Sequence, residues 1–168
     1  SYRHYALKAL GIREGNIIFL KDATQAQMTE TFGSATNHRG KVFNWTKPGE
    51  SRVFVFYVGH GAPGEDSQSG YLVPANANAA AINLNGYPVD LLMSNLSKIP
   101  AKSIQVVLES CFSGVSQAGS LLSNTSALVR KVKAPKVTSN ITLITAGGPD
   151  QIASWEEDES HGLFTKYF

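Results

Sequence analysis

Two apolar runs with little alternation constrain the fold of this chain more than any other feature. Residues 53–58 read Val-Phe-Val-Phe-Tyr-Val, and residues 104–108 read Ile-Gln-Val-Val-Leu. Short runs rich in β-branched and aromatic residues are typical of strands that are buried on both faces, as in parallel sheets. Segments with helical spacing alternate with the strand-like runs. This order predicts an α/β fold in which helices flank a mainly parallel sheet with right-handed crossovers.

The remaining elements are predicted from periodicity and from turn residues. Helices are expected over residues 2–10, 24–35 and 87–99, the first closed by Gly11 and the last ended before Pro100. In the second helix, Ala26, Met28 and Phe32 are expected to face inward, with Asp22 or Thr24 as its cap. Further strands are expected at residues 16–21, 71–74 and 141–146. Residues 36–50 and 62–70 are expected to be irregular.

Composition excludes several classes of protein. The 168 residues are 42% hydrophobic and form one expected domain, residues 1–168, with a net charge of +2. This balance predicts no nucleic-acid partner and no membrane partner, and no apolar run approaches the roughly 18 residues of a membrane span. A single cysteine excludes an internal disulfide and a cysteine-rich zinc site but does not fix the compartment. No signal-peptide pattern begins the chain, and we expect a cytoplasmic protein.

A histidine and the single cysteine follow the two apolar runs. The first run leads into Gly-His-Gly at His60, and the second leads into Glu-Ser-Cys-Phe-Ser-Gly at Cys111. Ligands of open parallel sheets bind outside the carboxyl ends of the strands, so both residues belong where such a fold does its chemistry. An imidazole beside a thiol makes an activated nucleophile.

The glycines around His60 also allow a second interpretation. Gly59, Gly61 and Gly64 spell the G-x-G-x-x-G pattern of dinucleotide-binding folds. That pattern needs a helix to begin at the third glycine and an acidic residue about 20 positions later. Pro63 and the polar run after Gly64 favour a loop instead, and residues 75–86 contain no Asp or Glu. The dinucleotide interpretation is therefore the weaker one.

The order and spacing of the motifs resemble a known family. The histidine motif (residues 57–61, Tyr-Val-Gly-His-Gly) precedes the cysteine motif (residues 109–114, Glu-Ser-Cys-Phe-Ser-Gly), and 51 residues separate His60 from Cys111. Residues 70–74 (Gly-Tyr-Leu-Val-Pro) and 162–165 (Gly-Leu-Phe-Thr) add to the likeness. The chain resembles the caspase-like cysteine peptidases, and among them the bacterial and metacaspase-type members. The resemblance implies a caspase-like sandwich around the parallel sheet and cysteine endopeptidase activity on a protein or peptide substrate.

The resemblance assigns catalytic roles to three residues. His60 and Cys111 would form a dyad, and the backbone N–H groups of Gly61 and Cys111 would form the oxyanion hole. The expected chemistry requires no cofactor, and we assign no metal ligand. Calcium is left open, because many metacaspases need it, whereas asparagines (Asn76 and Asn78) follow the Leu-Val-Pro motif here.

The expected substrate carries Arg or Lys at P1. Glu109 stands two residues before Cys111, where metacaspases have aspartate, and it is the leading determinant. Ser154-Trp155-Glu156 looks like the Ser-Trp-Arg stretch of animal caspases with the cation replaced by an anion, and Asp66 is a further candidate for the S1 pocket. Acidic groups would repel an aspartate side chain and pair with a guanidinium or an ammonium group.

The resemblance raises three further expectations. Residues 115–140 form an expected processing or linker loop, with self-cleavage candidates at Arg130, Lys131, Lys133 and Lys136. Caspase-like domains begin with a central strand before the first helix, and this chain starts inside what would be that helix. We therefore expect that strand to come from an upstream segment of the parent chain, and an upstream or downstream segment of that chain is an expected partner. The alternative function is a catalytically idle caspase-like interaction or scaffold module.

Overall fold

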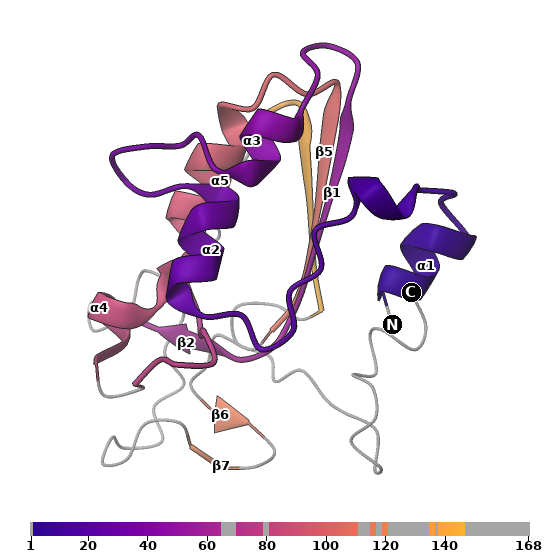
Figure 1. Cartoon of the computed structure of the whole chain (residues 1–168). Helices are drawn as coiled ribbons and strands as arrows, with labels where there is room; N and C mark the ends of the chain where they lie inside the picture. The colour runs from indigo at the N-terminus through magenta and orange to yellow at the C-terminus, as the bar shows by residue number, and fades with distance from the viewer. Residues whose placement is uncertain are drawn as a thin grey trace.

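The fold is organised around a three-stranded parallel sheet. The computed structural model describes residues 2–64, 70–78, 81–110, 115–116, 119–120, 135–136 and 138–146. Strands β1 (Arg52–Val58), β5 (Ser103–Glu109) and β8 (Ile141–Thr145) pair in the order β1-β5-β8, and both pairings are parallel. The two apolar runs are thus β1 and β5. The predicted α/β class and mainly parallel sheet are confirmed, with helices beside the sheet (Figure 1).

Helices lie on both faces of this sheet. Helices α2 (Gln25–Phe32), α3 (Lys41–Trp45) and α5 (Val89–Ser97) are on one side, and α1 (Tyr2–Lys8) is on the other (Figure 1). Thr24 caps α2 through a reciprocal capping box with Gln27, as one of the two predicted caps. Gly33 ends the same helix at φ 92°, a backbone conformation that favours glycine. Local sequence signals therefore set both ends of α2.

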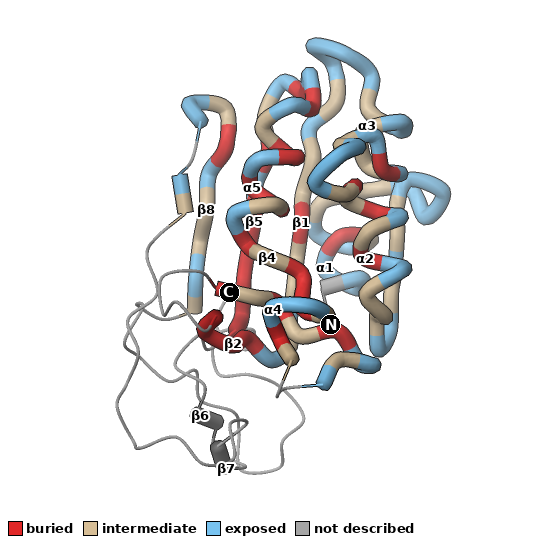
Figure 2. The backbone as a smooth tube through the Cα atoms, turned by 90° about the vertical axis from the view of Figure 1, so that its left-hand side faces the viewer, coloured by how far each residue is buried: buried red, intermediate tan, exposed pale blue. Residues whose placement is uncertain are grey.

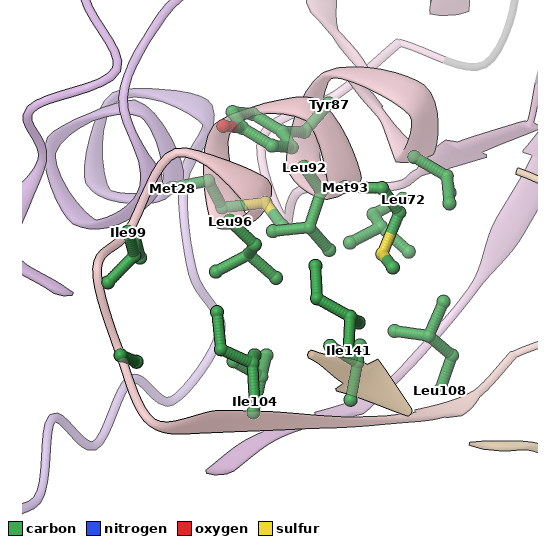
Figure 3. Packing of buried hydrophobic residues seen from close by; sticks show 14 residues of the cluster. Met28, Leu72, Tyr87, Leu92, Met93, Leu96, Ile99, Ile104, Leu108 and Ile141 are labelled. Carbon is green, nitrogen blue, oxygen red and sulfur yellow. The ribbon is translucent and has the colours of Figure 1, made fainter. Parts of the chain in front are cut away.

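The main core lies between α5, α2 and the sheet. Leu92 and Leu96 of α5 point toward Ile104 of β5 (Figure 3), and their exposed fractions are 0%, 1% and 0%. Met28 of α2 joins them, at 2% exposed. Figure 2 shows the buried residues concentrated in β5 and in the elements that cover it. Burial of these large side chains removes apolar area from water, and the free energy gained stabilises the packing of the helices on the sheet. On the other face, the rings of Tyr5 in α1 and Phe56 in β1 meet edge to face at 6.4 Å.

A smaller antiparallel sheet lies at the carboxyl end of β1 (Figure 1). It contains β2 (Gly61–Pro63), β3 (Gly70–Leu72) and β4 (Tyr87–Pro88) in the order β2-β3-β4. Helix α4 (Ile82–Asn85) precedes β4. Two short strands, β6 (Val115–Ser116) and β7 (Gly119–Ser120), pair with each other inside the expected processing loop.

Several local predictions are wrong. Residues 16–21 were expected to form a strand, but a 3-10 helix (η1, Glu14–Asn16) ends at Asn16, and the extended backbone at Ile17 joins no ladder with another described strand. Strand propensity needs a partner edge before it gives a strand. Residues 36–50 contain α3, residues 62–70 contain part of β2, and Ala26 is exposed rather than inward-facing.

Strand β1 has the composition of an interior strand at an edge position. Among the described strands only β5 pairs with it. The central apolar residues of β5 are each at most 2% exposed, whereas Val55 is the one buried residue of β1 and Val58 is 42% exposed. Natural edge strands usually carry charges, prolines or bulges instead. The expected additional strand would pair at this edge, and that expectation stays a prediction.

Candidate functional site

His60 lies two residues beyond the end of β1, at the carboxyl edge of the parallel sheet. Its side chain is exposed. Its backbone carbonyl accepts two hydrogen bonds, from the Tyr57 hydroxyl at 2.8 Å and from the Val73 N–H at 3.0 Å. The peptide of His60 is therefore held from two directions while its imidazole faces solvent. The predicted position of His60 after a strand of the parallel sheet is confirmed, but the prediction that this strand is buried on both faces is wrong, because only Val55 of β1 is buried.

Gly61 is the first residue of β2 and is buried. It lies opposite Leu72 of β3, and the Val73 N–H donates to the carbonyl of His60. This pattern makes Gly61 and Leu72 a non-hydrogen-bonded pair, in which the polar backbone groups point away from the partner strand. The N–H of Gly61 therefore points away from β3. An N–H that the ladder does not use is available to a ligand, as the expected oxyanion role requires.

The pairing of β1 with β5 aligns the two motifs. Every partner pair in this ladder, from Arg52 with Ser103 to Val58 with Glu109, differs by 51 positions. The same number separates His60 from Cys111 in the sequence. The alignment continues one step beyond β1, where the Gly59 N–H donates to the Glu109 carbonyl at 3.2 Å. The histidine motif and the beginning of the cysteine motif therefore leave the sheet side by side.

Glu109 and Ser110 are both buried at the end of β5. Their exposed fractions are 2% and 6%. A buried carboxylate is costly unless other groups compensate it, and Glu109 does have an interaction partner. The Ser110 hydroxyl has no hydrogen-bond partner among the described residues. No pattern in the sequence singled out the hydroxyl of Ser110, because a serine next to a cysteine has no distinctive chemistry of its own. Two buried polar side chains, those of Glu109 and Ser110, therefore directly precede Cys111 in the chain.

Most of the other predicted site residues lie outside the described part of the chain. These are Cys111, Asp66, Ser154, Trp155, Glu156, Arg130, Lys131 and Lys133. Lys136 is described and is exposed, next to Pro135. Its exposure is what a self-cleavage site requires.

Tyr57 also contacts this candidate site, although the sequence did not single out its hydroxyl. It belongs to an apolar strand, and its ring packs against the core cluster, as expected for a core residue. Its hydroxyl, however, reaches beyond the end of β1 to His60 and to Val73, which follows β3. A tyrosine among phenylalanines and valines was the available signal, since a phenylalanine would fill the core equally well.

The described residues hold no group of three or more metal-ligating side chains. Of the asparagines considered for calcium, Asn76 uses its side-chain oxygen to accept a hydrogen bond from the Gln25 N–H at 3.0 Å. That bond satisfies one of the backbone donors at the start of α2. Within the same described residues, no helix has the length and apolar character needed to cross a membrane.

The sequence matches no protein-family model and no curated relative. The likeness to caspase-like peptidases therefore depends on the motifs themselves and on the arrangement of the strands that carry them.

Proposed function

We propose that this chain is a cysteine endopeptidase with a caspase-like fold, and that it hydrolyses peptide bonds after Arg or Lys. The observation that carries the proposal is the in-register pairing of β1 and β5. It brings the histidine motif and the start of the cysteine motif to one edge of a parallel sheet, where α/β folds bind their ligands. The 51-residue offset of this ladder equals the separation of His60 from Cys111.

In the proposed reaction, His60 takes the proton of the Cys111 thiol. A free thiol has a pKa of about 8.5, so only a few per cent is thiolate at neutral pH without such help. The thiolate attacks the carbonyl carbon of the scissile peptide, the C–N bond breaks, and the imidazolium donates its proton to the leaving amine. Water then hydrolyses the thioester with His60 as the base, which restores the thiol.

The proposed oxyanion hole uses the N–H groups of Gly61 and Cys111. The Gly61 N–H supports this role because it points away from β3. A glycine also lets the substrate carbonyl approach without a side chain in the way. Each oxyanion donor typically contributes about 10²–10³ in rate.

The proposed preference for basic P1 residues depends on Glu109. Its burial supports a role at the base of a specificity pocket, because a charge–charge contact with Arg or Lys is strongest away from water. Asp66, Ser154, Trp155 and Glu156 remain subsidiary candidates on sequence grounds. Animal caspases, which cut after aspartate, carry a neutral Gln at the position of Glu109 and an Arg at the position of Glu156.

The test uses matched fluorogenic peptides that end in Arg, Lys or Asp, with and without calcium. Because Cys111 is the single cysteine, Cys111→Ala removes the whole thiol content of the chain and is a clean control. Cleavage after Arg or Lys that is lost in Cys111→Ala supports the proposal. Cleavage after Asp alone would support peptidase activity but contradict the proposed role of Glu109 in the choice of the P1 residue. A folded protein that cleaves none of the peptides, and whose Cys111 no arginyl or lysyl thiol probe labels, would favour the idle scaffold module.

A further inference from the structure

The hydroxyl of Tyr57 joins two segments that are distant in the sequence. It donates to the carbonyl of His60 at 2.8 Å and accepts from the N–H of Val73 at 3.2 Å. His60 follows β1, whereas Val73 follows β3. The hydroxyl therefore connects the end of the parallel sheet to the smaller antiparallel sheet at the position of the expected catalytic histidine. A phenylalanine here would keep the packing of the ring and lose both hydrogen bonds.

Gly59 has no side chain, and this leaves room for the same hydroxyl. A Cβ atom on Gly59 would lie 2.9 Å from the Tyr57 hydroxyl oxygen and 3.1 Å from the ring carbon that bears it. This glycine is needed for close approach, because real Cβ contacts essentially never fall below 3.0 Å. The backbone from β1 to His60 thus passes directly over the tyrosine.

The hydroxyl stays protonated at any pH at which the protein would work. Burial raises the pKa of Tyr57 to about 12, with the hydrogen bond to Val73 opposing this shift. A group with such a pKa does not exchange protons near neutrality and is a poor acid or base for catalysis. It is a permanent hydrogen-bond donor.

We infer that Tyr57 is a positioning residue for His60, whose hydroxyl fixes the histidine peptide at the carboxyl edge of β1. The inference rests on the proposed peptidase function. No described residue forms a hydrogen bond with the His60 imidazole, so within this part of the chain the backbone bonds from Tyr57 and Val73 hold the residue. A general base must stay within hydrogen-bond reach of the proton that it removes, and a small displacement lowers the rate.

The experiment compares Tyr57→Phe with Tyr87→Phe. Tyr87 is a matched control, because its buried hydroxyl also donates to a backbone carbonyl at 2.8 Å, that of Gly33. Both variants lose one hydrogen-bonded hydroxyl. For Tyr57→Phe we expect kcat toward an Arg-ended peptide to fall about five- to tenfold with KM unchanged, as for the loss of one hydrogen bond. Tyr87→Phe is expected to leave kcat unchanged. Equal kcat for wild type and Tyr57→Phe overturns the inference.

A second measurement separates this inference from the peptidase proposal. The Val73 N–H is shared between the Tyr57 hydroxyl and the His60 carbonyl. Its hydrogen exchange therefore reports how firmly the hydroxyl holds the two segments together, whether or not the protein cleaves anything. We expect faster exchange at Val73 in Tyr57→Phe and no change there in Tyr87→Phe. If wild type cleaves no peptide, the proposed function fails, and unchanged exchange at Val73 in Tyr57→Phe overturns the positioning role as well. If wild type is inactive but the Val73 amide exchanges faster in Tyr57→Phe, the peptidase proposal fails while Tyr57 is still the group that holds the His60 segment.

A double-mutant cycle covers the case in which Tyr57→Phe disturbs folding. Gly59→Ala places a Cβ atom against the Tyr57 hydroxyl oxygen, and Tyr57→Phe removes that oxygen. We expect the double variant to lose no more activity, and to exchange no faster at Val73, than the worse of the two single variants. Fully additive losses would show that the two positions act independently and would overturn the inference.

Discussion

Replacement of Leu92 by alanine tests whether the core between α5 and the sheet carries the stability of this fold. Leu92 is 0% exposed and belongs to the cluster that packs α5 on β5 (Figure 3). Alanine removes three buried carbon atoms and leaves a cavity, which for a fully buried leucine costs about 3 kcal/mol of unfolding free energy. In a chain of this size such a loss lowers the melting temperature by roughly 6 to 12 °C. Urea denaturation followed by circular dichroism measures the free energy, and differential scanning calorimetry measures the temperature.

Leu84 provides a control with the same chemical change. It lies in α4 and is 82% exposed, so its side chain already contacts water in the folded state. Leucine and alanine also have similar helix propensities. We expect Leu84→Ala to change the unfolding free energy by no more than about 0.5 kcal/mol. A loss below about 1 kcal/mol for Leu92→Ala, or equal losses for the two variants, would refute the assignment of the core to this interface.

Three further predictions address a helix cap, substrate choice and alkaline pH. Thr24→Ala removes one half of the capping box of α2, and we expect a loss of about 1 kcal/mol in urea denaturation, with an unchanged midpoint contradicting the cap. Glu109→Gln replaces the buried carboxyl group with a neutral amide. We expect kcat/KM toward Arg-ended peptides to fall about tenfold or more while a neutral P1 loses less, and an unchanged Arg preference would exclude Glu109 from the pocket. Burial raises the pKa values of Tyr57 and Tyr87 to about 12 from 10.0, so the folded state favours the neutral phenols. Their stabilising contribution is complete below pH 10 and is lost as pH rises toward 12. We therefore expect the urea midpoint to fall between pH 10 and pH 12, and to fall less steeply in Tyr87→Phe than in wild type.

The sequence predicted those parts of the fold in which a local pattern coincides with burial. The runs that became β1 and β5, the cap at Thr24 and the end of α5 before Pro100 all follow from patterns within a few residues. The segment at residues 16–21 shows the limit of this reasoning. Its apolar residues favour a strand, but a strand also needs a neighbouring edge, and no local pattern reports whether that edge exists.

The candidate site was predictable in its position and less so in its detail. The ends of two parallel strands fixed where His60 would lie, because parallel strands end at one edge of a sheet. The link from the Tyr57 hydroxyl to Val73 spans 16 residues and depends on how β3 returns to the end of β1. The burial of Glu109 and Ser110 likewise depends on long-range packing, which no spacing in the sequence encodes.

The edge position of β1 has a consequence for how the chain behaves at high concentration. Among the described strands only β5 pairs with β1, and an apolar strand at the edge of a sheet is a template for intermolecular pairing. Two copies that meet along this edge would bury exposed side chains such as Val58, and such contacts promote aggregation. We therefore expect copies of the chain to associate first at this edge. Val58→Lys places a charge at this exposed position, and we expect it to oppose such pairing.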